Sequence, residues 1–151
     1  MKNEMTLIFS ALSENEAFAR NAVAAFCVGL DPTIDQINDI KTAVSEAVTN
    51  CVVHAYPTNA EDNFVTVKTV VSDTTVHIVV SDTGIGIDDI EGAMQPFYTS
   101  KPDQERSGMG FTVMESFMDS LSVENNSPRG TVVSMSKTIR GADWKDKKHC
   151  N

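Results

Sequence analysis

A chain of 151 residues with 41% hydrophobic and 22% charged residues fits one globular domain with a single core. Its net charge of −9 argues against nucleic acid and anionic membranes as direct partners, because both would repel an acidic surface. The three cysteines lack paired spacing, and the chain has neither a signal peptide nor an apolar run of about 20 residues, so we expect a cytoplasmic protein without a disulfide framework.

The N-terminal part predicts one strand followed by one helix. Residues 5–12 alternate loosely between apolar and polar side chains, which favours a strand. Ser13 and Glu16 have the spacing of a capping box at a helix start, and Gly29 is placed to end that helix.

A second helix is predicted to begin near Thr33 and to run to about Tyr56. Thr33 and Gln36 have the spacing of another capping box, and Pro57 is a stop signal. The apolar stripe of this helix consists of Ile37, Ile40, Val44, Val48 and Cys51.

The rest of the chain predicts two hairpins separated by a long irregular segment and a short helix. In order, we expect strands at 64–71 and 75–81, an irregular segment at 88–107, a helix at 108–118, and strands at 121–125 and 131–138. Because the strands cluster in hairpins, the predicted fold is an α+β two-layer sandwich, with a mixed, mostly antiparallel sheet and helices on one face. We assign residues 1–139 to this domain and expect 140–151 to form a polar, disordered tail.

The first candidate site segment lies on the second predicted helix. Glu46, Asn50 and His54 recur every four residues, so they share one face, apart from the apolar stripe. An Asn carbonyl oxygen suits Mg²⁺, and a nearby Glu can accept a proton from a hydroxyl or from water. A solvated polar face is the simpler interpretation of this spacing alone.

The second candidate segment, Asp82–Gly86, follows a strand of buried character. An Asp at a strand end can accept a hydrogen bond from an exocyclic amine such as that of adenine, and glycines let the backbone approach a flat base. A glycine-rich turn explains the same residues without a ligand.

The third candidate segment, residues 105–111, opens a helix with Gly108 and Gly110. Backbone N–H groups at a helix N-terminus favour an anion, and Lys101 and Arg106 are nearby cations. The segment matches neither a P-loop nor a dinucleotide-binding fingerprint. A flexible loop before a helix is the alternative.

The order of these segments resembles the Bergerat-fold superfamily of gyrase-type ATPases and histidine-kinase catalytic domains. More closely, residues 13–20, 44–50, 98–102 and 105–111 resemble the anti-sigma F factors, the sporulation serine kinases of endospore-forming bacteria. The resemblance extends over about residues 1–138. It implies a protein-serine kinase, dependent on ATP and Mg²⁺, that sequesters a sporulation sigma factor and phosphorylates a serine of an anti-anti-sigma protein.

The resemblance also implies a role for each site residue. Glu46 would be the general base, Asn50 the Mg²⁺ ligand and Asp82 the adenine-binding residue. Arg20 would contact the sigma factor and the anti-anti-sigma protein. The other implied ATP-binding positions are Gly84, Gly86, Lys101, Arg106, Ser107, Gly108, Met109, Gly110, Phe111 and Thr131. Ala55 departs from the glycine expected there.

The family pairs into homodimers, and the resemblance extends this expectation to the present chain. Three alternatives stay open. The chain could be a stress-response anti-sigma kinase of the same family, or a nucleotide-gated sigma-binding module without significant kinase activity. It could also be a histidine-kinase catalytic domain cut from a larger protein, although it lacks a helical hairpin carrying a phosphoacceptor histidine.

Overall fold

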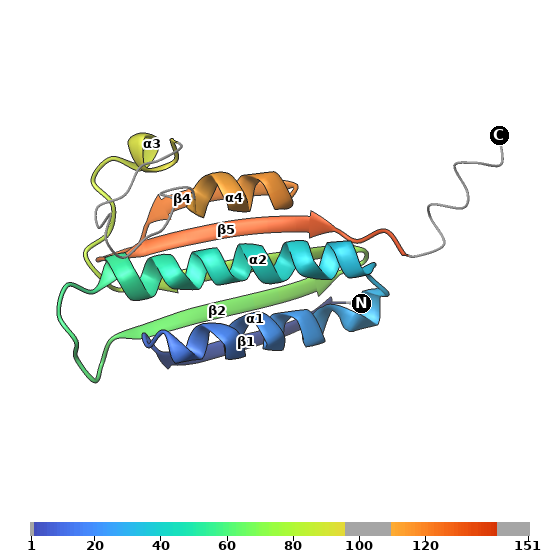
Figure 1. Cartoon of the computed structure of the whole chain (residues 1–151), viewed down its shortest axis with the longest axis horizontal. Helices are drawn as coiled ribbons and strands as arrows, with labels where there is room; N and C mark the ends of the chain where they lie inside the picture. Colours follow the sequence, from blue (N-terminus) through green and yellow to red (C-terminus); the bar gives the residue numbers. More distant parts are fainter. Residues whose placement is uncertain (1, 96–109, 142–151) are drawn as a thin grey trace.

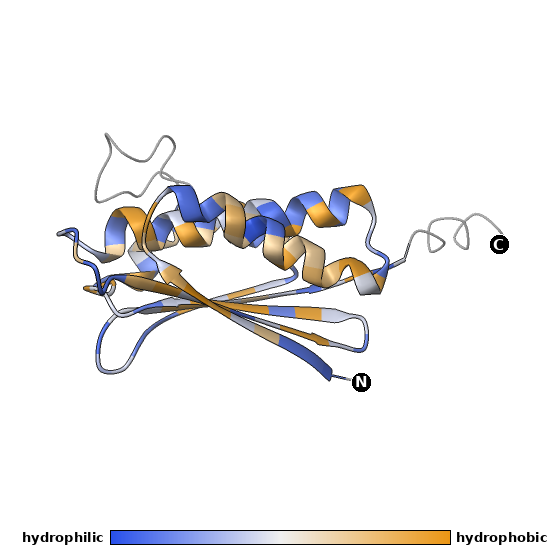
Figure 2. Cartoon of the chain, turned by 90° about the horizontal axis from the view of Figure 1, so that it is seen from below, coloured by the Kyte–Doolittle hydropathy of each residue, from blue (hydrophilic) through white to orange (hydrophobic). Residues whose placement is uncertain are grey.

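Helices cover one face of a five-stranded sheet in the computed structural model, which describes residues 2–95 and 110–141 (Figures 1 and 2). The strands are β1 (Lys2–Ser10), β2 (Phe64–Ser72), β3 (Thr75–Asp82), β4 (Ser120–Asn125) and β5 (Thr131–Thr138). The helices are α1 (Glu14–Cys27), α2 (Ile34–Asn50), α3 (Ile90–Ala93) and α4 (Gly110–Phe117), with a 3₁₀ turn at Val28–Leu30 and a π-helical turn at Cys51–Ala55. None of the helices in these ranges has the length and apolarity needed to cross a membrane.

The sheet has the strand order β1-β2-β3-β5-β4. The predicted α+β fold class is confirmed, and every pairing between the described strands is antiparallel, where a mixed sheet was predicted. At the tight turn between β2 and β3, Asp73 adopts a left-handed backbone (φ 54°), a conformation that Asp tolerates better than most side chains. The register turns alternate residues of β2 and β3 toward the helices, and Val65, Val67, Val76, Ile78 and Val80 are fully buried there.

Helix α2 begins with the predicted capping box. The Gln36 amide donates to Thr33 Oγ1 (3.2 Å), and the Thr33 amide donates to Gln36 Oε1 (2.9 Å). The predicted apolar stripe faces the sheet, with Ile40, Val44 and Val48 fully buried. Beyond Asn50 the chain continues as the π-helical turn, so the predicted helix end near Tyr56 is close to the observed one.

Two predictions about the N-terminal part are wrong in detail. Ser13 precedes α1, but its side chain makes no capping hydrogen bond. Its expected partner Glu16 is engaged by Arg20 and by Ser45 of α2, so a contact between helices takes the place of the local one. Gly29 lies within the 3₁₀ turn, and Asp31 instead takes the left-handed backbone (φ 53°) that ends this region.

The strand predicted at 5–12 begins earlier, because Lys2–Ser10 pairs along its whole length with β2. The segment predicted as irregular contains α3, which Asp89 caps by accepting a hydrogen bond from the Gly92 amide (2.9 Å). The remainder of that segment, residues 96–107, lies outside the described residues, as does the predicted tail beyond Gly141.

Candidate functional site

A cavity of about 290 Å³ opens between α2, the chain after β3 and the start of α4. The three sequence segments singled out above all contribute to its wall, although they lie far apart in the chain. Of the predicted site residues, those that line it are Asn50, Asp82, Gly86, Gly110, Phe111 and Thr131. Residues that are distant in the sequence therefore form a single concave site of the kind that binds small ligands.

Asp82 is the buried polar group at the base of this cavity, with 4% of its surface exposed. Its Oδ1 accepts hydrogen bonds from the amides of Gly84 (3.0 Å) and Thr131 (3.2 Å). Burial raises the pKa of Asp82, and hydrogen bonds from the Gly84 amide, the Cys51 thiol and the Thr131 amide oppose that shift. These bonds hold the carboxylate in one orientation at the cavity wall.

Gly84 has a packing role that the sequence pattern does not reveal. It is not among the residues that line the cavity. A Cβ on Gly84 would lie 2.1 Å from the carbonyl oxygen of Ala55, and the Ile85 amide donates to that same oxygen (2.9 Å). The close approach of β3's end to the π-helical turn therefore requires glycine at position 84. Ala55, where the resemblance implied a glycine, is buried at this contact.

Sequence reasoning missed two asparagines that hold the loop around Gly86. The Asn125 side chain exchanges two hydrogen bonds with the backbone of Ile87 (3.0 and 3.1 Å), and Asn126 Nδ2 donates to Asp82 O (2.9 Å). Gly86 itself has φ 75°, a backbone conformation that favours glycine. Asparagine is common in turns, so two asparagines where β4 ends and the turn begins carried no signal for this contact.

Glu46 and Asn50 meet the first residue of α4. A Cβ on Gly110 would lie 3.3 Å from Asn50 Oδ1, from Asn50 Nδ2 and from Glu46 Oε2. Glycine at this position therefore lets the N-terminus of α4 approach both side chains closely. A carboxylate, a side-chain amide and the N-terminus of a helix therefore lie together here.

The donor set suits Mg²⁺ if a ligand supplies most of the oxygens. The residues that the structure describes contain no group of three or more His, Cys, Asp or Glu side chains able to hold a metal. Mg²⁺ commonly takes only one or two protein oxygens together with phosphate oxygens and water. Asn50, lining the cavity beside the N-terminus of α4, fits that pattern.

Arg20 lies on α1 and does not line the cavity. Its Nη1 donates to both carboxylate oxygens of Glu16 (2.8 and 2.7 Å), and Ser45 Oγ donates to the same carboxylate. The side chain is still 36% exposed. Arg20 thus belongs to a partly exposed cluster of polar side chains, with Glu16 and Ser45, that connects α1 to α2. Ser45 directly precedes Glu46 in the chain.

Five of the predicted nucleotide-binding residues cannot be placed relative to the cavity. They are Lys101, Arg106, Ser107, Gly108 and Met109, and all lie outside the described residues.

The fold and the cavity together define a histidine kinase-like ATPase domain, and a family model of that description matches residues 9–137. A protein named anti-sigma F factor from Clostridium beijerinckii is 58% identical over 89% of this chain and 94% of its own length. Another of the same name, from Geobacillus kaustophilus, is 52% identical over the full length of both chains. The chain belongs to the anti-sigma F factor family.

Structural comparison supports the same fold at a greater evolutionary distance. The crystal structure of the RsbU and RsbW domains of Rv1364c from Mycobacterium tuberculosis matches with a TM-score of 0.65 and 16% sequence identity. The match covers 91% of this chain and 32% of that one. The two-layer arrangement is therefore retained where little sequence similarity remains.

Proposed function

We propose that this protein holds a sporulation sigma factor in a nucleotide-dependent manner and phosphorylates a serine of an anti-anti-sigma protein. The observation that carries the kinase half is the meeting of Glu46 and Asn50 with Gly110 at the N-terminus of α4, where Asn50 and Gly110 line the cavity. A proton acceptor, a metal ligand and a phosphate-binding helix end are the groups that phosphoryl transfer requires close together. The names of the relatives support the sigma-binding half.

In this proposal the nucleotide spans the cavity. Asp82 accepts a hydrogen bond from the exocyclic amine of adenine, and Gly86 and Thr131 lie beside the base. The amides at the start of α4 bind the phosphates at the opposite end. The other proposed phosphate-side residues are Lys101, Arg106, Ser107, Gly108, Met109 and Phe111.

The proposed transfer step uses two side chains of α2. Asn50 would hold Mg²⁺, which neutralises charge on the phosphates when bound. Glu46 accepts the proton of the partner's serine hydroxyl as its oxygen bonds to the γ-phosphorus. The bond from the γ-phosphorus to the bridging oxygen breaks, and ADP leaves with that electron pair.

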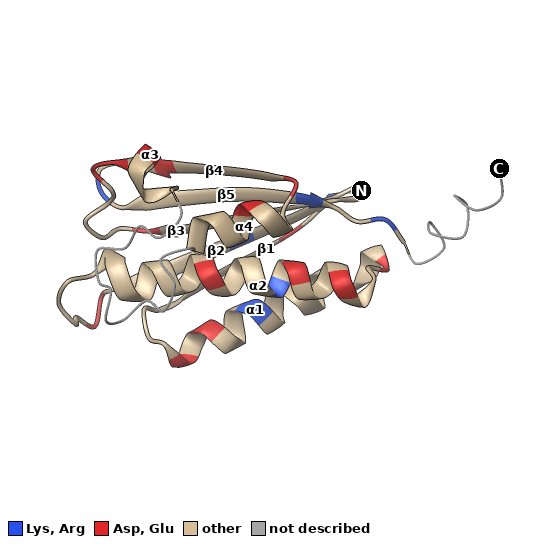
Figure 3. Cartoon of the chain, turned by 45° about the horizontal axis from the view of Figure 1, so that its top comes forward, with Lys and Arg blue, Asp and Glu red and all other residues tan. Residues whose placement is uncertain are grey.

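The negative charge of this protein favours release of the phosphorylated anti-anti-sigma protein. Figure 3 shows acidic residues along both α1 and α2, and the whole chain has a net charge of −9. Phosphorylation adds about −1.5 to −2 charge to the partner's serine. We therefore expect the phosphorylated partner to leave this surface more readily than the unmodified one.

The proposal is tested by capturing a purified sporulation sigma factor with the protein loaded with Mg-ATP or with ADP. We expect stronger capture with Mg-ATP. In parallel, labelled γ-phosphate should appear on a serine of the anti-anti-sigma protein. ATP-dependent capture without labelling would favour a binding module that lacks catalysis, and the absence of both would contradict the proposal.

Arg20→Glu is expected to weaken capture of the sigma factor at least tenfold, since it removes a charge-assisted contact worth about 1.5–3 kcal/mol and adds repulsion. ATP affinity should stay unchanged, because Arg20 does not line the cavity. Capture can be measured by surface plasmon resonance. Lys2→Glu, a charge reversal at another exposed ion-paired residue, serves as the control. Equal binding by wild type and Arg20→Glu would exclude Arg20 from the partner surface.

We also propose a homodimer that uses the face of the sheet opposite the helices. Figure 2 shows no helix on that face, and Ile8 and Phe64 are exposed on neighbouring strands there, at 68% and 43%. Ile8→Lys should therefore shift the protein toward monomer in sedimentation velocity. Ile34→Lys, at an isoleucine 81% exposed on α2, is the matched control and should leave the dimer intact. A dimer unaffected by Ile8→Lys would place the interface elsewhere.

A further inference from the structure

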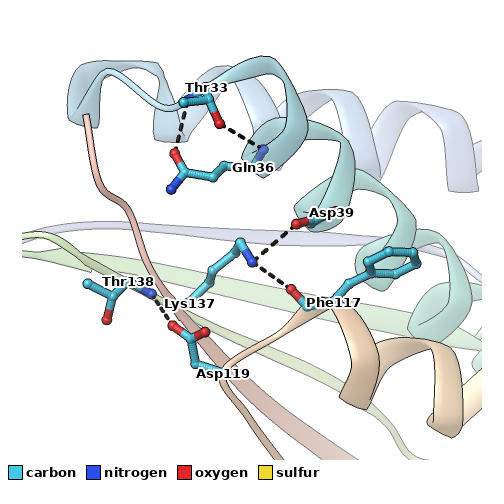
Figure 4. Close-up of polar contacts among 7 residues, drawn as sticks. All are labelled: Thr33, Gln36, Asp39, Phe117, Asp119, Lys137 and Thr138. Carbon is cyan, nitrogen blue, oxygen red and sulfur yellow. Dashed lines mark hydrogen bonds and ion pairs between the residues drawn. The ribbon is translucent and has the colours of Figure 1, made fainter. Parts of the chain in front are cut away.

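The Lys137 side chain bridges the C-terminal end of α4 and helix α2 (Figure 4). The residue lies near the end of β5, on the helix-covered face of the sheet, and its side chain is only 12% exposed. Its Nζ donates to the carbonyl oxygen of Phe117, the last residue of α4 (2.7 Å), and lies 3.2 Å from Asp39 Oδ2 on α2. One ammonium group thus joins a strand and two helices.

The chain that leaves α4 is held at the same place. The Asp119 amide donates to Ser136 O (2.8 Å), and Asp119 Oδ2 accepts a hydrogen bond from the Thr138 amide (2.7 Å). The residues on either side of Lys137 therefore also bind the exit of α4. A cation is favoured at a helix C-terminus, where free carbonyl groups and the helix dipole attract it.

The opposite end of α4 is the end that lies in the cavity. Gly110 approaches Asn50 and Glu46 as described above, and Phe111 lines the cavity. The helix has eight residues, so it is roughly 12 Å long at about 1.5 Å per residue. It lies along α2 (Figure 3), and Met114 at its middle is fully buried. Because close-packed interiors transmit strain, a displacement of one end of this short helix would reach the other.

We propose that Lys137 is a positioning residue for the phosphate end of the nucleotide. By holding Phe117 against Asp39 of α2, it sets where Gly110 stands relative to Asn50 and Glu46. The inference rests on the proposed function, because it takes these residues as the phosphate-side groups. The adenine end is held separately, by Asp82 and the amides of Gly84 and Thr131. Among the described residues, the Lys137 ammonium instead binds Phe117 O and Asp39. Loss of Lys137 should therefore weaken the binding of phosphates and spare the binding of adenosine.

The test compares Lys137→Met with wild type for three ligands: adenosine, ADP and Mg-ATP. We expect Mg-ATP and ADP to bind roughly tenfold more weakly and phosphoryl transfer to slow by about 10- to 100-fold, since small displacements of reacting groups have effects of this size. Adenosine affinity should change less than twofold. Lys137→Arg, which can still donate to both partners, should restore most of the lost affinity. Lys68→Met, at a lysine that is 50% exposed on β2, is the matched control.

Hydrogen exchange of the unliganded protein provides a readout that does not depend on nucleotide. Amides of 110–117 should exchange faster in Lys137→Met than in wild type, while those of α2 change little. Unchanged exchange there, or equal losses of adenosine and ATP affinity, would overturn the inference in favour of general stabilisation. If wild type bound no ATP, the proposed function would fail, and the exchange data would still decide whether Lys137 positions α4. If Lys137→Met does not fold, Asp39→Asn removes the same ion pair and is judged by the same measurements.

Discussion

Asp82→Asn is expected to weaken ATP binding about 10- to 100-fold, because it replaces the proposed charge-assisted hydrogen bond to adenine, worth about 1.5–3 kcal/mol. The asparagine side chain has only one oxygen. The backbone amides of Gly84 and Thr131 already donate to a side-chain oxygen at this position. An asparagine oxygen bonded to them would leave its NH₂ group, a donor, facing the adenine amine. Titration calorimetry with Mg-ATP measures the loss. Wild-type affinity in this variant would disprove the adenine assignment.

The same substitution should leave the unliganded protein at least as stable as wild type. Burial raises the pKa of Asp82, so the native state retains this proton to higher pH than the unfolded chain. The free energy of unfolding therefore falls as pH rises from the pKa of Asp82 in the unfolded chain to its higher pKa in the native state. The asparagine amide is neutral and avoids this loss of stability. Thermal unfolding at neutral pH tests the point. Asp73→Asn, in the β2–β3 turn where the left-handed backbone tolerates Asn, is the control for both measurements.

Glu46→Gln is expected to lower phosphoryl transfer to the anti-anti-sigma protein by about 10²- to 10⁴-fold, the usual contribution of a general base. ATP affinity should remain within a few fold of wild type, because glutamine keeps the shape that meets Gly110. Single-turnover transfer from labelled ATP separates the two effects.

Glu115→Gln, at an exposed glutamate of α4, is the matched control and should transfer phosphate normally. Normal transfer by Glu46→Gln would exclude Glu46 as the base. A wild-type protein that binds ATP and sigma factor but transfers nothing would instead favour the binding module.

The sequence by itself was sufficient for the fold class, because the signals for it are local. The Thr33–Gln36 capping box and the apolar stripe of α2 depend on spacings of three and four residues. The β2–β3 hairpin depends on two β-branched runs and a short turn. The resemblance implied nucleotide-site roles for Asn50, Asp82 and Gly110, and these three residues line one cavity.

Only the tertiary structure decided which polar groups are partners. Glu16 has the local spacing for a cap, yet Ser45 from another helix engages it, because packing α1 on α2 brings the two together. Position 84 must be glycine because the carbonyl oxygen of Ala55 leaves no room for a Cβ. The Lys137 ammonium donates to the carbonyl oxygen of Phe117 at the C-terminal end of α4. These contacts join residues separated by about 20 or more positions, and their existence depends on how the layers pack. No periodicity or short motif in the chain encodes that packing, so the cavity could be predicted from sequence while the groups that hold it in shape could not.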